Sequence, residues 1–153
     1  MRTLLLCASL AAACGGGDEE SGEPLLAGSL TGEYDGTAFT AEFGFATVYQ
    51  QQNLIALGDG PIHCGSEDDR DPPSGFNVAL SLPAFAADSY TSVFVQLYRN
   101  EGSFEGVGSN QGSVTLSAVS ESSIAGSVEY DYTDDDGRHF AVSGTFEVVR
   151  CAP

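Results

Sequence analysis

The chain has 153 residues, and its 22 acidic side chains against five basic ones give a formal net charge of −17 at pH 7. This balance excludes ordinary nucleic-acid binding, because contacts to phosphates need lysine and arginine to replace the released counterions. It also disfavours a domain that lies flat on anionic lipid headgroups. The length is sufficient for one domain and not for two, once an N-terminal segment is set aside.

The first 13 residues have the layout of an export signal. Arg2 supplies one positive charge, and an apolar run over residues 4–13 ends in three alanines before Cys14. About ten apolar residues match the core of a signal peptide and fall well short of the ~20 that a membrane-spanning helix needs. We therefore expect residues 1–13 to be removed, which leaves four arginines against 22 acidic residues.

The end of this signal resembles the bacterial lipobox. Leu10-Ala11-Ala12-Ala13-Cys14 brings small residues up to a cysteine, although the leucine lies four residues before the cysteine and not the usual three. The resemblance implies that Cys14 becomes the first residue of a lipoprotein and carries fatty-acyl chains such as palmitate. Two or more chains anchor a protein stably, at about 0.8 kcal/mol per buried methylene. The alternative is an ordinary secretory signal cut near Ala13, with Cys14 left as a free thiol.

The resemblance also implies a place in the cell envelope. Gly15 stands where enteric bacteria use an aspartate to retain lipoproteins at the inner membrane, so the outer membrane is the expected destination. Residues 14–27 are rich in glycine, glutamate and serine, and they are predicted to form a flexible acidic linker. The folded domain is expected to span residues 28–153, with the lipid as its contact to the membrane.

Two cysteines remain for the domain, Cys64 and Cys151. An even pair in an oxidising compartment predicts a disulfide. In the chain-entropy view, a bridge that closes so long a loop stabilises the fold by about 4.6 kcal/mol. The alternatives are a Cys64–His63 nucleophile or a metal pair, but two cysteines and two histidines without ligand spacing make a poor zinc site.

The domain alternates between apolar and polar residues with a period of two, which is typical of half-buried strands. The clearest segments are 39–45, 76–82, 124–132 and 140–148, and weaker strands fit 29–34, 53–58, 90–98, 103–107 and 113–119. In the first segment, Phe43 and Phe45 are expected to point into the core. The pattern predicts an all-β domain of about eight to nine strands after a disordered tether, either a single antiparallel β-sandwich or a small meander β-barrel.

Turn residues separate these segments. Asp35-Gly36 is a two-residue hairpin signal, and Asp134-Asp135-Asp136-Gly137 predicts a longer hairpin loop. Asn100-Glu101-Gly102 and Asn110-Gln111-Gly112 predict two further turns. Residues 59–75 contain three prolines and Cys64, so they are expected to form a long loop that a disulfide would attach to the C-terminal strand.

Two short motifs resemble a family of small, uncharacterised bacterial β-rich lipoprotein domains. The first is Tyr34-Asp35-Gly36-Thr37-Ala38-Phe39-Thr40-Ala41, which is similar to their opening hairpin. The second is Val142-Ser143-Gly144-Thr145-Phe146, which is similar to their last strand. The family has no established activity, so the resemblance implies a β fold and assigns no site.

The loop after residue 130 is a candidate calcium site, because Asp131, Asp134 and Asp136 precede a glycine and Ca²⁺ takes several oxygen ligands. Against this, Tyr132 occupies the first position of the EF-hand pattern, and Ser143 stands in place of its bidentate glutamate. The alternative is a solvated hairpin loop. No other cofactor is expected.

A second acidic run, Glu67-Asp68-Asp69-Arg70-Asp71, lies in the long loop that contains Cys64. Long loops on a rigid scaffold often carry function. Glu67, Asp68, Asp69, Arg70 and Asp71 are therefore the candidate recognition residues, and an exposed, charge-paired insertion is the alternative.

No motif for nucleophilic, metal-dependent or nucleotide-dependent catalysis is present. His63 and His139 are the only histidines, and His139 takes the outward register of its strand. The first hypothesis is a non-enzymatic binding module whose loops engage an envelope protein or glycan. The alternatives are a β-barrel carrier of a small apolar ligand and, with less support, a calcium-binding or hydrolytic envelope protein.

Overall fold

The computed structural model describes residues 22–68 and 73–152. They form nine strands, as the sequence predicts, and one 3₁₀ turn, η1 (Ser66–Asp68). The strands are β1 (Ala27–Tyr34), β2 (Thr37–Ala41), β3 (Phe43–Tyr49), β4 (Gln52–Gly58), β5 (Gly75–Leu82), β6 (Ser89–Asn100), β7 (Phe104–Val119), β8 (Ser123–Thr133) and β9 (His139–Arg150). Within the described residues, no helix has the length and apolar character needed to span a membrane.

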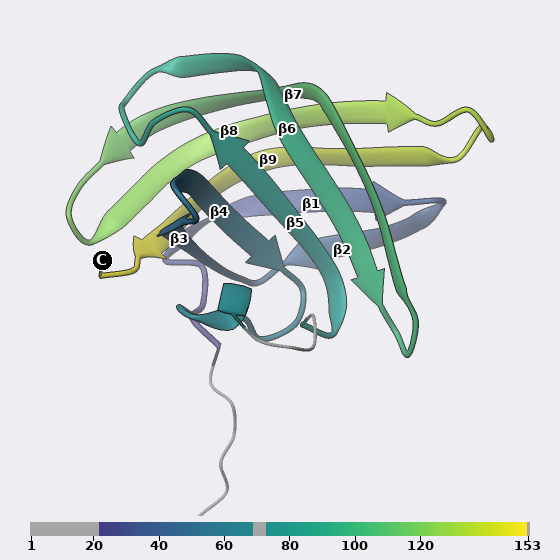
Figure 1. Cartoon of the computed structure of the whole chain (residues 1–153), viewed down its shortest axis with the longest axis horizontal. Helices are drawn as coiled ribbons and strands as arrows, with labels where there is room; N and C mark the ends of the chain where they lie inside the picture. The colour runs from purple at the N-terminus through teal and green to yellow at the C-terminus, as the bar shows by residue number, and fades with distance from the viewer. Residues whose placement is uncertain (1–21, 69–72, 153) are drawn as a thin grey trace, which may run out of the picture.

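The strands make one sheet that closes on itself. Its order is β2-β1-β9-β3-β4-β5-β6-β7-β8, and β8 pairs with β9 to complete a ring that runs from β9 through β3 to β8. Of the two architectures that the sequence leaves open, the observed one is therefore a closed barrel. One edge of β9 serves two partners, because β1 pairs antiparallel with residues 140–147 and β3 pairs parallel with Val149 and Arg150. The β1–β2 hairpin is thus an extension outside the ring (Figure 1).

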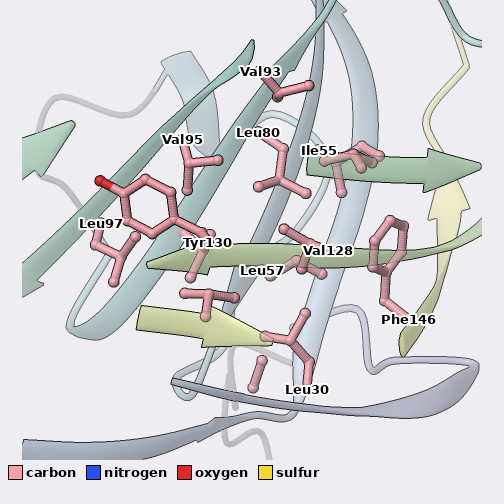
Figure 2. Packing of buried hydrophobic residues seen from close by; sticks show 14 of the residues in the cluster. Leu30, Ile55, Leu57, Leu80, Val93, Val95, Leu97, Val128, Tyr130 and Phe146 are labelled. Carbon is pink, nitrogen blue, oxygen red and sulfur yellow. The ribbon is translucent and has the colours of Figure 1, made fainter. Parts of the chain in front are cut away.

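The buried apolar cluster has members on every strand, and Figure 2 shows part of this packing. Alternate residues of β5 and β9 are buried as their sequence pattern predicts, among them Leu80, Val142 and Phe146. The same interior contains Leu30 from β1 and Val128 from β8, which are both fully buried. This packing removes apolar surface from water at about 25 cal/mol per Å² and is the main source of stability.

The predicted strand over residues 39–45 is divided at Glu42; Phe45 is buried as expected but on the other face of the sheet, and Phe43 is only half-buried. The Glu42 amide donates to the Gly58 carbonyl, while its own carbonyl accepts from the Leu25 amide. The chain changes direction there, so the alternation shifts by one residue. In β3, Ala46 points inward, and Phe45 lies on the outer surface of the barrel, where it is nonetheless 1% exposed.

Three of the four predicted turns are confirmed, and one is wrong. Asp35 and Gly36 both have positive φ, at 48° and 80°, as a tight hairpin turn requires. Asn110-Gln111-Gly112 does not form a turn, because β7 runs through it without interruption. A side chain at Gly112 would meet the Val95 side chain and the Val93 carbonyl, so the glycine allows β7 to lie close against β6.

The predicted flexible linker also extends too far into the domain. The Glu23 amide donates to the Ile62 carbonyl at 2.7 Å, and the Leu26 amide donates to the Glu147 carbonyl at 2.8 Å. Pro24 forms a β-bridge with Phe43. The domain therefore begins no later than residue 22, before the expected boundary at residue 28. Residues 14–21 of the expected linker, and Cys14 with them, lie outside the described residues.

Candidate functional site

A groove lies on the outer surface of β3, β4, β5 and β6. Its floor follows from the strand register, which places Phe45 beside Ala56 and Ala56 beside Ala79. Ala79 in turn pairs with Gln96 on β6. Two alanines thus stand between a phenylalanine and a glutamine, and the sheet surface is hollow where their side chains are short.

The walls of the groove come from three places, and they enclose about 440 Å³. Phe94 and Tyr98 rise from β6 on either side of Gln96, while Tyr49 and Gln52 close the end at the β3–β4 hairpin. The remaining wall is the loop between β4 and β5, which contributes Ile62, Ser66, Glu67 and Pro73. A volume of this order is that of a small-molecule site.

The loop wall is attached to the barrel at both sides. Cys64 is joined to Cys151 by the predicted disulfide, with Cα atoms 5.6 Å apart. Ile62 is 2% exposed, and its carbonyl accepts the Glu23 amide. Within the loop, the Ser66 hydroxyl accepts the His63 amide at 2.9 Å. These contacts give the groove a defined wall where the sequence by itself shows only a long polar insertion.

Two polar side chains hold the end of the loop where β5 begins. The Asp59 carboxylate accepts the Phe76 amide at 2.8 Å, and burial raises the pKa of Asp59 above its usual range. Asn77 is 2% exposed, and its amide nitrogen lies 3.3–3.4 Å from the carbonyls of Pro73, Ser74 and Gly75. The amide nitrogen of Asn77 is therefore a structural donor beneath the loop, whereas its buried Oδ1 has no hydrogen-bond partner among the described residues.

The groove is nearly neutral on a strongly acidic protein. Among the described residues that line it, Glu67 carries the only charge, and the Glu67 carboxylate accepts the Gly65 amide at 3.1 Å. Burial raises the pKa of Tyr98 to about 12, so its hydroxyl stays protonated at neutral pH. The remaining polar groups are the hydroxyls and amides of Tyr49, Gln52 and Gln96 together with two serines.

The candidate recognition loop is thus placed in part. Glu67 lines the groove, and Asp68 ends η1, whereas Asp69, Arg70 and Asp71 lie outside the described residues. The strand residues that form the floor and the opposite wall were not expected to bind anything. The available signal was the pair Ala56 and Ala79, two small residues at outward positions of neighbouring strands, but their pairing is visible only once the register is known.

The candidate calcium ligands are not brought together. The Asp134 carboxylate accepts the Asp136 and Arg138 amides at 3.0 and 2.9 Å and forms an ion pair with the Arg138 guanidinium at 2.8 Å. Asp131 points instead towards His139 on the neighbouring strand. Within the described residues, these three carboxylates do not form a group of converging ligands. The hairpin loop is a turn that Asp134 organises internally.

His139 lies on the outer surface between two carboxylates from neighbouring strands. Its Nδ1 is 3.1 Å from Glu33 Oε1, and its Nε2 is 3.4 Å from Asp131 Oδ2. The hydrogen bond to Glu33, followed by that to Asp131, raises the pKa of His139 above its ordinary value of 6.5. The imidazolium therefore links β1, β8 and β9.

The raised pKa of His139 predicts a pH dependence of stability. A folded-state pKa above the unfolded value means that the stabilisation is fully present below about pH 6.5 and is lost as the pH rises through the folded pKa. NMR titration of the imidazole should give a pKa above 6.5, and Glu33→Gln should lower it. Denaturant unfolding of His139→Gln should lose the corresponding pH dependence. An imidazole that titrates identically in Glu33→Gln and in the unaltered protein would contradict the assignment.

A third cluster joins Glu23 to the disulfide. The ligand atoms of Glu23, Cys64 and Cys151 lie within 4.8 Å of one another, and Glu23 Oε2 is 3.1 Å from Cys64 Sγ. The two sulfur atoms are bonded to each other, so neither is a thiolate that binds a metal. The carboxylate lies beside the disulfide at the point where the chain enters the domain.

Comparison with protein-family models, with curated proteins and with solved structures found no match to this chain.

Proposed function

We propose that this chain is a lipid-anchored binding module of the bacterial cell envelope that receives its partner in the outer groove. The observation that carries the binding role is the groove itself, a hollow of about 440 Å³ lined by aromatic side chains and by residues with amide and hydroxyl groups. Sites with this combination of apolar walls and a few polar groups are the usual ligand sites of proteins. The lipobox-like residues before Cys14 support the anchor.

The position of the groove agrees with such an anchor. Seven residues separate Cys14 from Gly22, and the eight Cα–Cα steps between them span at most about 29 Å in a fully extended chain. Glu23 contacts the loop wall through Ile62 and lies beside Cys64. A lipid on Cys14 would therefore hold the groove end of the domain close to the membrane.

The internal-carrier alternative receives no support from the barrel interior. Leu57, Leu80, Leu97 and Val128 are 0–1% exposed and fill the space between the layers, as Figure 2 shows. The groove is on the opposite side of the same strands, because its lining residues alternate in sequence with these core residues. A ligand therefore has access to the outer surface and not to the barrel interior. The described residues of the groove form no catalytic arrangement that would support the hydrolytic alternative.

The anchor and the groove are tested together in a bacterial host with two membranes. A photoreactive amino acid replaces Gln52 at the rim of the groove, in the native sequence and in Cys14→Ser. We expect the protein that keeps Cys14 to be in the outer-membrane fraction and to give a crosslinked product. We expect Cys14→Ser in the soluble fraction, because loss of the acyl chains removes about 0.8 kcal/mol of membrane affinity per buried methylene. Fractionation and gel mobility measure both outcomes.

Two controls define the failure of this proposal. The same photoreactive residue at Glu129, an exposed position on β8, should give no product. Ala79→Leu, which fills the floor of the groove, should abolish the product from Gln52. An unchanged membrane fraction for Cys14→Ser would overturn the anchor, and crosslinking that is absent or equal at both positions would overturn the binding groove.

A further inference from the structure

The floor of the groove has no free strand edge. The floor residues Ala56, Ala79 and Gln96 lie on β4, β5 and β6, and each of these strands pairs with a neighbour on both sides. An extended peptide therefore cannot add itself to the sheet here, and it would forgo the backbone hydrogen bonds on which strand addition depends. On the strand side of the groove, recognition therefore comes from side chains, which favours a ligand that carries its own rings and polar groups.

The walls offer flat aromatic surface beside groups that both donate and accept hydrogen bonds. Phe94 is 39% exposed, and its ring tip covers Gly108, where an added Cβ would lie 2.7 Å from the ring. Gln52 and Gln96 each present an amide with two donor hydrogens and an acceptor oxygen. The electron-rich face of an aromatic ring attracts weakly positive C–H groups, so such rings suit a sugar ring whose C–H bonds share one face.

The charge of the groove further limits the chemical class of ligand that it can bind. Glu67 is the only charged residue among the described lining residues, while the whole chain has 22 acidic residues against five basic ones. An anionic ligand would meet this negative field, whereas a neutral ligand does not. The Glu67 carboxylate is an acceptor, and hydroxyl groups are donors that suit it.

We propose that the groove binds a neutral oligosaccharide, an inference that rests on the proposed function. The sugar rings lie against Phe94 and Tyr98, and the sugar hydroxyl groups form hydrogen bonds with Gln52, Gln96 and Glu67. The short side chains of Ala56 and Ala79 let the sugar rings approach the sheet. The loop between β4 and β5, which the disulfide joins to Cys151, forms the wall of the groove opposite β6.

The test is calorimetric titration of the intact acylated protein, kept in a detergent without a sugar headgroup. The probes are the neutral tetrasaccharides of chitin, cellulose and starch, with tetragalacturonic acid as an anionic probe and a neutral capped pentapeptide as a non-sugar probe. We expect at least one neutral tetrasaccharide to bind with Kd below about 1 mM. Its binding should not change with salt concentration, because screening acts on charged pairs.

Three variants tie that binding to the groove. Ala79→Leu should lower the affinity at least tenfold by filling the floor, whereas Ala141→Leu, the same change on the outer surface of β9, should not. Gln96→Leu keeps the size of the side chain and removes its hydrogen bonds, so it should also lower the affinity at least tenfold. Thermal unfolding followed by circular dichroism verifies that each variant is folded.

The outcomes separate this inference from the proposed function. Failure of all three neutral tetrasaccharides to bind overturns the oligosaccharide, and so does tighter binding of the pentapeptide or of tetragalacturonic acid. If these failures occur while Gln52 still gives a groove-dependent crosslink, the binding module stands and its ligand belongs to another class. Tighter sugar binding by Gln96→Leu would also contradict the proposal, because it would assign the affinity to apolar contact alone.

Discussion

Replacement of both Cys64 and Cys151 by alanine is expected to lower the free energy of unfolding by up to about 4.6 kcal/mol. The disulfide closes a loop of chain between residues 87 apart in the sequence, so its loss frees the unfolded state much more than the folded one. Most small domains have only about 5–15 kcal/mol of stability to lose. Urea unfolding followed by circular dichroism measures the change, with tyrosine fluorescence as a second probe.

The barrel should nevertheless remain folded, and the groove should be the region that changes most. Without the bridge, the loop wall keeps the hydrogen bond that the Glu23 amide donates to Ile62 and the one that the Phe76 amide donates to Asp59. Amide hydrogen exchange should therefore rise at residues 62–66 before it rises in the strands. Cys14→Ser is the control, because it removes a cysteine and leaves the disulfide in place. Equal stability of the oxidised and reduced proteins would contradict the prediction.

The second large effect is expected from Phe146→Ala in β9. Phe146 is 2% exposed; it pairs with Gly28 on β1 and Gly126 on β8, and its ring lies close to Gly126. Truncation of a buried phenylalanine to alanine costs about 3–5 kcal/mol, since the cavity left behind does not close fully. The midpoint of urea unfolding should fall accordingly, with an unchanged slope.

Phe104→Ala is the matched control for this variant. Phe104 is 54% exposed and contacts Tyr98, with ring centroids 5.4 Å apart, outside the barrel. The same truncation there should cost about 1 kcal/mol or less, because little apolar surface returns to water. Similar losses for Phe146→Ala and Phe104→Ala would mean that the inside of the barrel is not the source of stability.

The sequence predicts the strands well and their relation to one another poorly. Period-two alternation is a local property, and it identifies β5, β8 and β9 together with their buried faces. It fails at Glu42, where hydrogen bonds to Gly58 and Leu25 divide one expected strand and carry Phe45 to the outer surface. It fails again at Gly112, where a glycine that reads as a turn is a close contact between β7 and β6.

For the candidate site too, the sequence predicts local features well and predicts poorly which residues lie together. Glu67 could be singled out in advance because a long acidic loop containing a cysteine stands out in the sequence. Asp131, Asp134 and Asp136 are also adjacent in sequence, yet strand pairing turns Asp131 towards His139 and engages Asp134 with Arg138. Nearness along the chain does not make the carboxylates converge.

By itself, the sequence determined that this is a β-rich domain with Cys64 and Cys151 as the available disulfide partners, because alternation, turn residues and cysteine number are all readable without a fold. Only the tertiary structure decided that the sheet closes into a barrel and that Ala56, Ala79 and Gln96 form one row under the loop. The physical reason is register. A shift of one residue between paired strands moves every side chain to the other face, and that choice depends on hydrogen bonds between segments far apart in the chain.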